Sequence, residues 1–203
     1  MSFRKFSARG EELRRAIAQE AARIMSEHGI EDYFLAKRKA AERLGVTDTA
    51  SLPRNTEIEA ALVEYQRLFA ADTHSQTIAE QRRAALAAMQ LLAEFEPRLV
   101  GPVLTGTATP HADIDLHVFA DPPEAVTFKL MDRGIPHEVL ERRVKMQADR
   151  AVNYPAVRFS AGDRTIDATV FPVDGIRQAP FSPVDGRPMR RAAITELAAL
   201  LEE

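Results

Sequence analysis

The sequence predicts an α/β (α+β) protein, with an N-terminal helical domain over residues 1–96 and a small mixed-sheet domain over residues 97–203. Apolar residues recur at helical spacing through the first half of the chain. Pro97 ends the last of these helices, because proline cannot continue a helix. Segments that alternate polar and apolar residues, as half-buried strands do, follow this proline. A length of 203 residues suits one domain of ordinary size and a smaller one.

The first half should form four helices. They are expected at residues 11–28, 31–44, about 55–69 and about 77–95, with the polar run 72–75 separating the last two. Gly29 and Gly45 follow the first two helices as C-terminal stops. Asn55 or Thr56 can cap the third. This half therefore reads as a helical module.

The second half should alternate strands with loops and shorter helices. Strands are expected at 99–101, 113–119, 137–146, 156–160 and 164–171, helices at 124–132 and 190–201, and loops at 105–110 and 172–188. The last two strands are separated by Ala161, Gly162 and Asp163, a three-residue hairpin. The result is a small mixed sheet.

Composition excludes several classes of function. The chain has no cysteine, which rules out a disulfide framework and thiolate zinc sites and fits a reducing, cytoplasmic location. No apolar run approaches the roughly 18 residues that a membrane-spanning helix needs. The formal net charge is −3, so there is no basic field to attract duplex nucleic acid. The expected protein has no membrane partner and no strong duplex nucleic-acid signal.

Residues 113–119 carry the most informative pattern. Strict alternation in a strand puts Asp113, Asp115 and His117 on one face and aliphatic residues on the other. Two carboxylates at neighbouring positions of one face repel each other, so they need an arginine or a divalent cation as counter-charge. Ligands that are all oxygen favour Mg²⁺ or Mn²⁺ over zinc. The strand therefore predicts a site for hard cations.

A loop rich in glycine and threonine precedes this strand. It contains Thr105, Gly106 and Thr107, and it follows a short apolar run that ends in Gly101. Such a loop can bring backbone N–H groups and hydroxyls close to phosphate oxygens. Together with the carboxylates, it indicates phosphoryl or nucleotidyl chemistry.

These residues resemble the nucleotidyltransferase superfamily of DNA polymerase beta type, especially its small bacterial members. The signature of that family is a strand ending in Gly-Ser, about ten residues with a second glycine, then Asp-x-Asp, with a third Asp on a later strand. Here Gly101 and Pro102 stand at the Gly-Ser position, Gly106 matches the second glycine, and Asp113 and Asp115 match the pair. The resemblance covers about residues 98–172, and Pro102 departs from it.

The resemblance implies an activity. Asp167, on the strand at 164–171, corresponds to the third acid, so Asp113, Asp115 and Asp167 would be the catalytic, metal-binding residues and Mg²⁺ or Mn²⁺ the cofactor. The reaction would move a nucleoside monophosphate from an NTP, with ATP the favoured donor, to a hydroxyl, and release pyrophosphate. The acceptor stays open between a protein side chain, a small molecule and an RNA end.

A further set of residues is expected to bind the nucleotide. Its members are Gly101, Thr105, Gly106, Thr107, Arg158 and Arg164. Arg142, Arg143 and Lys145 are either a solvated strand face or a clamp on the triphosphate. His117 shares the acidic face, where a lone histidine is more often a structural hydrogen-bond partner than a ligand.

Three other functions compete with nucleotidyl transfer. The first is a catalytically silent member of the same fold, a binding or antitoxin-like module, which the proline at position 102 favours. The second is a nucleotide-sugar glycosyltransferase that uses Asp-x-Asp on its metal, although the longer doubly wound region such enzymes need is missing before the motif. The third is a helical nucleic-acid adaptor, which the net charge disfavours.

Overall fold

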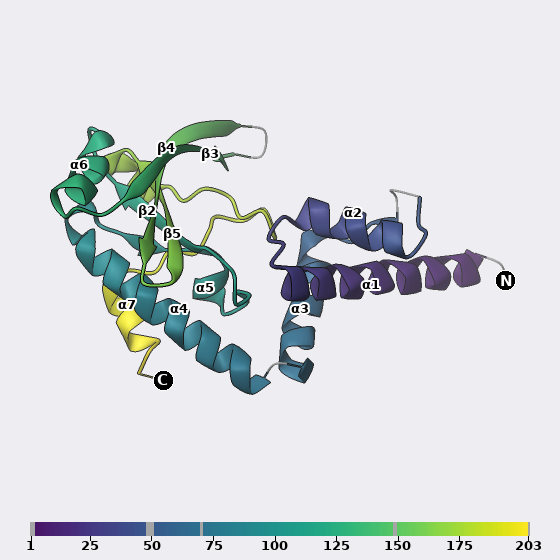
Figure 1. Ribbon diagram of the computed structural model, residues 1–203. Coiled ribbons are helices and arrows are strands. Elements are labelled where there is room, and N and C mark those ends of the chain that lie inside the picture. Colours follow the sequence, from purple (N-terminus) through teal and green to yellow (C-terminus); the bar gives the residue numbers. More distant parts are fainter. Residues whose placement is uncertain (1–2, 48–50, 70, 148–149, 203) are drawn as a thin grey trace. The chain divides into compact units, whose positions relative to one another are not determined.

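The computed structural model describes residues 3–47, 51–69, 71–147 and 150–202. The fold is α+β, with helices mostly in the N-terminal part and a five-stranded mixed sheet in the C-terminal part (Figure 1). The chain divides into two compact units. The helical unit ends at Ser75 and includes the short segments Thr109–His111 and Pro183–Asp185, and the sheet unit contains the remainder.

The helical unit is built on three helices. They are α1 (Phe3–His28), α2 (Tyr33–Arg43) and α3 (Asn55–Phe69). The second and third match the expected ranges to within two residues, whereas the first begins eight residues earlier than expected. Their apolar stripes meet in one core that includes Ile17, Ile24 and Ile58, all fully buried. Asp32 begins α2, because its carboxylate accepts hydrogen bonds from the backbone N–H groups of the next turn.

The fourth helix differs from the expectation. Helix α4 runs over Ala71–Leu91, so the polar run 72–75 is helical and does not separate two helices. This run contains no glycine or proline, and polarity alone does not stop a helix. From Gln76 onward α4 belongs to the sheet unit, so the first unit ends about twenty residues before the boundary expected at residue 96. A short 3-10 turn, η2 (Ala93–Phe95), follows it.

The sheet has the strand order β1-β2-β5-β4-β3. Its strands are β1 (Arg98–Leu99), β2 (Ile114–Phe119), β3 (His137–Lys145), β4 (Ala151–Ala161) and β5 (Arg164–Phe171). Strands β2 and β5 pair in parallel, and the other pairs are antiparallel. Between and after the strands lie α5 (Gly101–Thr105), α6 (Glu124–Asp132), η3 (Val173–Arg177) and α7 (Ile194–Ala199). The closing helix is thus shorter than the expected 190–201, and β4 is longer than the expected 156–160.

Alternation along the strands gives the sheet two different faces. One, the apolar face, consists of Ile114, Leu116, Val118, Val157, Phe159, Ile166, Ala168 and Val170. It packs against α4, α6 and α7 through buried residues such as Met89, Leu130 and Leu197, and Figure 1 shows α4 running along the sheet. The other, the charged face, includes Asp115, His117, Arg142, Arg158, Thr165, Asp167 and Thr169, together with the aromatic residues Phe119 and Phe171.

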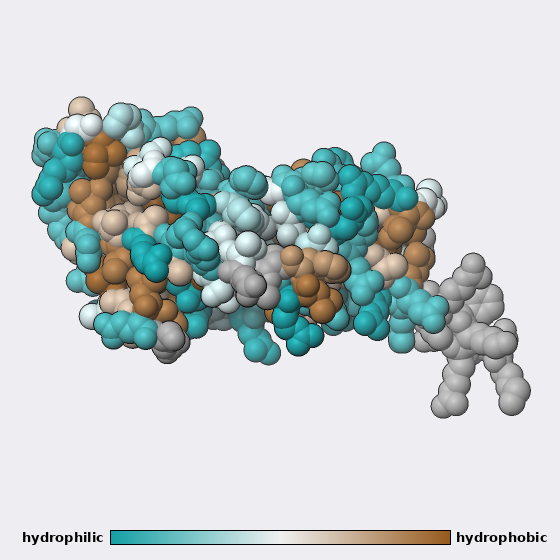
Figure 2. All heavy atoms as spheres, turned by 60° about the horizontal axis from the view of Figure 1, so that its bottom comes forward, coloured by the Kyte–Doolittle hydropathy of each residue, from teal (hydrophilic) through white to brown (hydrophobic). Residues whose placement is uncertain are grey.

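The described helices include no membrane-spanning segment. None of them is both long and apolar enough to cross a bilayer. The surface turned forward in Figure 2 is mostly hydrophilic, with hydrophobic residues in separate groups.

Candidate active site

The central pair of the site is Asp115 on β2 and Asp167 on β5. The two residues are directly opposite each other in the parallel β2–β5 pair, so both side chains lie on the charged face. Asp113 stands immediately before β2, in the loop that follows α5. Asp167 is 2% exposed, whereas the side chain of Asp113 is 31% exposed. The carboxylate in the middle of the sheet is therefore the one removed from water.

Arg158 joins two of the three acids. It lies on β4 opposite Asp167, and its Nη2 is 3.1 Å from Oδ2 of Asp113 and 3.0 Å from Oδ2 of Asp167. A single guanidinium nitrogen thus donates to both carboxylates. Asp113, Asp115 and Asp167 converge on one patch.

Arg142 is the second cation of the patch, and it comes from edge strand β3. Its Nε donates to Oδ1 of Asp167 at 3.1 Å, and its Nη2 contacts Oδ2 of the same carboxylate. This is the two-pronged geometry in which arginine binds a carboxylate most strongly. A buried carboxylate needs such a counter-charge, because removing it from water costs several kcal/mol. Arg142 thus pairs with Asp167 and is not simply part of a solvated strand face, while its role as a clamp on the triphosphate stays a prediction.

Gly101 lets α5 begin against Asp115. Its φ is +71°, a conformation that glycine adopts without strain. A Cβ at this position would lie 2.7 Å from Oδ2 of Asp115, which is closer than any real contact. Glycine at this position thus suits both the backbone conformation and the close approach of the Asp115 carboxylate. A phosphate contact at Gly101 stays a prediction.

Pro102 serves α5 in its first turn, where a missing N–H is tolerated. Its carbonyl accepts from the N–H groups of Gly106, Thr107 and Ala108 at 2.8, 2.9 and 3.2 Å. Proline thus has a structural role at the position where the family signature has serine.

The Gly/Thr segment after Pro102 is partly helical. Thr105 is the last residue of α5 and lies outside the loop, which begins at Gly106 with φ +81°. The hydroxyls of Thr105 and Thr107 are 3.0 Å apart, and Arg82 of α4 donates to the carbonyls of Val103 and Leu104. These bonds fix the end of α5. Phosphate binding by Thr105, Gly106 and Thr107 stays a prediction.

Arg164 is not brought to the acids. It is three residues before Asp167, an odd number, so the two side chains point to opposite faces of β5. Its Nη2 is 3.3 Å from Oε2 of Glu80 on α4, and its Nε is 3.5 Å from Oδ1 of Asp163. The expectation that Arg164 lies beside Arg158 at the acids is therefore wrong. Counting positions from Asp167 along the strand would have placed Arg164 on the opposite face.

His117 lies next to the acids on the charged face and has a structural partner. It is 5% exposed, and its Nδ1 accepts a hydrogen bond of 3.0 Å from Nε of Arg191. Burial, with the nearby positive charge of Arg191, lowers the pKa of His117 to about 3. The imidazole is therefore neutral at physiological pH and holds its Nδ1 lone pair toward the guanidinium.

Arg191 is a residue that sequence reasoning missed. Its guanidinium stacks over the rings of Phe119 and Phe171, 5.0 and 5.3 Å from the ring centroids, and donates to the carbonyls of Gly175 and Ile176. Burial, with the charge of Arg98, lowers its pKa to about 10. Arg191 was expected inside a helix, but α7 begins three residues later. No local pattern signals this role, because its partners come from three distant segments.

The acids suit a hard divalent cation in chemistry. Asp113, Asp115 and Asp167 offer only carboxylate oxygens, the ligands that Mg²⁺ and Mn²⁺ prefer. In the described part of the chain, however, no group of three or more acidic or histidine side chains is gathered as a metal shell. Two guanidiniums hold the carboxylates of Asp113 and Asp167 instead. A cation at these oxygens would have to displace them.

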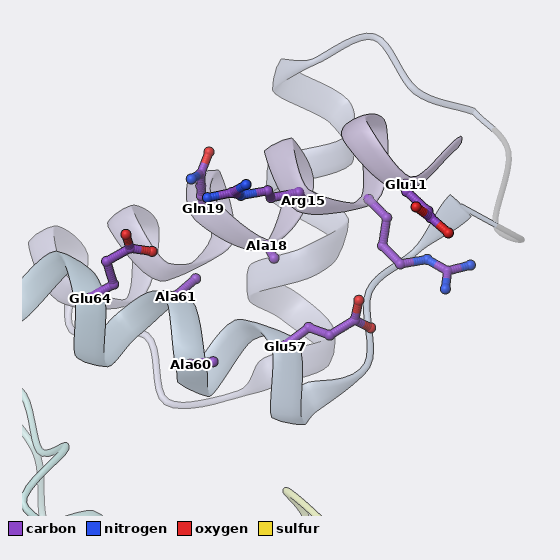
Figure 3. A pocket seen from close by; sticks show the side chains of 9 residues that line it. Glu11, Arg15, Ala18, Gln19, Glu57, Ala60, Ala61 and Glu64 are labelled. Carbon is purple, nitrogen blue, oxygen red and sulfur yellow. The ribbon is translucent and has the colours of Figure 1, made fainter. Parts of the chain in front are cut away.

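The helical unit contains an open pocket, which does not include the residues expected to carry the chemistry. Its lining comes from α1 and α3, as Figure 3 shows, and comprises Glu11, Arg14, Arg15, Ala18, Gln19, Glu57, Ala60, Ala61 and Glu64. Small apolar residues alternate there with charges of both signs. This lining favours no particular ligand.

Comparison with known proteins gives no match among protein-family models, curated proteins or solved structures. Function is therefore argued from the residues and their geometry.

Proposed function

We propose that the charged face is the active site of a metal-dependent nucleotidyltransferase. The enzyme moves a nucleoside monophosphate from an NTP, with ATP the favoured donor, to a hydroxyl acceptor. The observation that carries this proposal is the convergence of Asp113, Asp115 and Asp167 beside the glycine that begins α5. The same order of elements, a glycine after a strand, Asp-x-Asp on the next strand and a third Asp on a later one, is similar to nucleotidyltransferases of DNA polymerase beta type.

The three acids would hold the metal, and Mg²⁺ or Mn²⁺ would neutralise the triphosphate and activate the acceptor hydroxyl. The chain's own residues supply the rest. Arg158 presents a guanidinium at the acids, where it can donate to phosphate oxygens. Gly101 lets the carboxylate of Asp115 lie where a side chain at residue 101 would collide with it.

The proposed transfer needs no reactant besides the NTP and the acceptor. The acceptor oxygen attacks the α-phosphorus, the bond from the α-phosphorus to the bridging oxygen of the β-phosphate breaks, and pyrophosphate leaves. The proton of the hydroxyl passes to a carboxylate of the site, for which Asp167 is the candidate. Positioning and charge stabilisation supply most of the catalysis in reactions of this kind.

A silent nucleotide-binding or antitoxin-like module of the same fold is the second candidate. Pro102 in place of serine favours it, because proline offers neither a hydroxyl nor an N–H to a phosphate. The arginines on Asp113 and Asp167 favour it too, since in a silent module they could remain there as permanent counter-ions.

The test is label transfer. Each of the four NTPs, labelled at the α-phosphate, is incubated with cell extract and the wild-type protein, the Asp113→Ala/Asp115→Ala variant, or Asp163→Ala as control. Asp163 is also an aspartate, and its side chain is 87% exposed in the β4–β5 turn. Relative to extract without added protein, we expect additional labelled product with the wild type and the control but not with the double variant, and no additional product from γ-labelled NTP. The labelled species identifies the acceptor. Equal labelling with the double variant, or none with the wild type, contradicts the proposal.

A further inference from the structure

In the ion pairs of Asp167, the carboxylate is buried and the arginines are partly exposed. Asp167 is 2% exposed, but the side chains of Arg142 and Arg158 are 41% and 36% exposed. The carboxylate is fixed in the sheet, where neighbouring strands surround it. Each arginine is a long, flexible side chain that reaches it from the solvent side. The arginines can therefore leave the carboxylate while the carboxylate stays in place.

One divalent cation would change the net charge of the site from −1 to +1. Asp113, Asp115 and Asp167 carry three negative charges when ionised, and the two arginines carry two positive ones. Nη2 of Arg158 donates to Oδ2 of both Asp113 and Asp167, and Arg142 contacts both carboxylate oxygens of Asp167. A divalent cation bound to these oxygens would meet two guanidiniums of like charge at contact distance. Bare metal and the arginines therefore compete for the same atoms.

A nucleotide resolves this competition. Its triphosphate brings several negative charges and many acceptor oxygens, which match the planar donors of arginine. Guanidiniums released from the carboxylates would have an anion to move to, within the reach of their own side chains. A metal that arrives with the nucleotide thus gains the carboxylates without leaving the arginines unpaired.

We propose that Arg142 and Arg158 are exchangeable counter-ions: they occupy Asp113 and Asp167 in the empty site and move to the nucleotide phosphates when a metal–nucleotide complex binds. This inference rests on the proposed function and adds two statements to it. Arg142, on edge strand β3, is a phosphate-binding residue. Metal binds together with nucleotide, and the empty site resists bare metal.

The test is a titration with Mn²⁺, followed by electron paramagnetic resonance of the free ion. It compares the wild type with Arg142→Ala and with the control Arg143→Ala. Arg143 is the next residue on β3, carries the same charge, is exposed, and points to the opposite face. Without nucleotide, we expect Arg142→Ala to bind Mn²⁺ about tenfold more tightly than the wild type, because a competing cation is gone. The control should match the wild type.

A second titration uses ATP in the presence of saturating Mn²⁺. Here we expect the opposite sign, with affinity for ATP about tenfold weaker in Arg142→Ala, because charge-assisted hydrogen bonds to phosphate are lost. Arg142→Gln, which keeps an N–H donor but no charge, should move both affinities in the same directions. This second variant guards against a folding defect, and circular dichroism checks that each variant keeps its structure.

The outcomes separate the inference from the function. Equal affinity of the wild type and Arg142→Ala for bare Mn²⁺ overturns the exchange. Unchanged affinity for ATP overturns the phosphate-binding role of Arg142. Label transfer by the wild-type protein is a separate readout, and its absence counts against nucleotidyl transfer, while the two titrations decide on the exchange.

Discussion

The two faces of the sheet come from alternate residues of the same strands, and they are buried for different reasons. On the apolar face, Ile114, Leu116 and Ile166 are fully buried among helices, which is ordinary core formation. On the charged face, Asp167 is buried with almost no exposure, although an ion pair removed from water stabilises a fold less than apolar residues of similar size. Stability accounts for the first face. The burial of Asp167 on the second face is not explained by stability alone, and the proposed catalytic role would account for it.

The charged face is itself divided along the strands. The acids and their arginines occupy one end, and a cluster of Phe119, Phe171 and Met146 occupies the other. His117 lies between these ends and contacts both Phe171 and Arg191. The charged face thus has an apolar, aromatic end at Phe119 and Phe171 and a polar end at the acids.

The largest effect that separates the two faces should appear in stability. Ile166→Ala on the apolar face should cost about 2–5 kcal/mol, because it removes buried methylene groups and leaves a cavity. The matched change Thr165→Ala, at the neighbouring position of the charged face, should cost no more than about 0.5 kcal/mol. Urea unfolding of the two variants measures both values. Equal costs would show that the two faces do not differ in the way described.

Two glycines with the same backbone conformation give the next comparison. Gly101 and Gly162 have φ of +71° and +65°, and a Cβ at Gly162 meets nothing within 4 Å. Either change to alanine should cost about 1–2 kcal/mol for the left-handed backbone. Only Gly101→Ala also pushes the carboxylate of Asp115 aside, so it alone should weaken Mg²⁺-dependent nucleotide binding in calorimetry. Unchanged nucleotide binding by Gly101→Ala would show that Asp115 takes no part in the site.

The pH dependence of stability tests His117. The histidine has a pKa of about 3 in the folded protein and about 6.5 when unfolded. Between these values the unfolded chain binds a proton that the folded protein does not. The free energy of unfolding should therefore fall by about 1.4 kcal/mol per pH unit as the pH decreases from 6.5 toward 3, and this contribution should be absent above 6.5. His117→Gln should show a shallower slope in urea unfolding at pH 7, 6 and 5. The same slope in both proteins would mean that His117 is protonated in the folded state.

The smallest effect is expected from an arginine that faces the helices. Arg164 pairs with Glu80, whose side chain is 46% exposed. Exposed pairs of this kind contribute about 0.2–1 kcal/mol, and salt screens them. Arg164→Ala should thus cost less than about 1 kcal/mol at low salt and almost nothing in 1 M NaCl, as thermal unfolding would show. A larger, salt-independent loss would mean that Arg164 packs as a core residue.

The sequence predicts the strands well, because their signal is local. The alternation at 113–119 and 164–171 defines β2 and β5, and it places Asp115 and Asp167 on the polar side of each strand. It does not determine that β2 and β5 are neighbours, since that pairing joins segments about fifty residues apart. The convergence of the acids was accessible only through a resemblance to a known family.

The parts of the site that the sequence missed depend on tertiary contacts. The sequence does not decide between arginine and a divalent cation as the counter-charge, because Arg142 and Arg158 come from two other strands, β3 and β4. The polarity of the run 72–75 predicts a break, but the run is helical, because it contains no glycine or proline and polarity alone does not stop a helix. Arg191 has no signal at all, since its partners lie in β2, β5 and η3.

The central claim is that the charged face binds a metal-bound nucleotide, and isothermal titration calorimetry tests it most directly. The wild type and Asp115→Asn are titrated with each NTP, once in Mg²⁺ and once in EDTA. We expect the wild type to bind at least one NTP in Mg²⁺, with binding lost in EDTA and lost in Asp115→Asn. Failure to bind any NTP, or binding that neither EDTA nor the substitution changes, would contradict the claim.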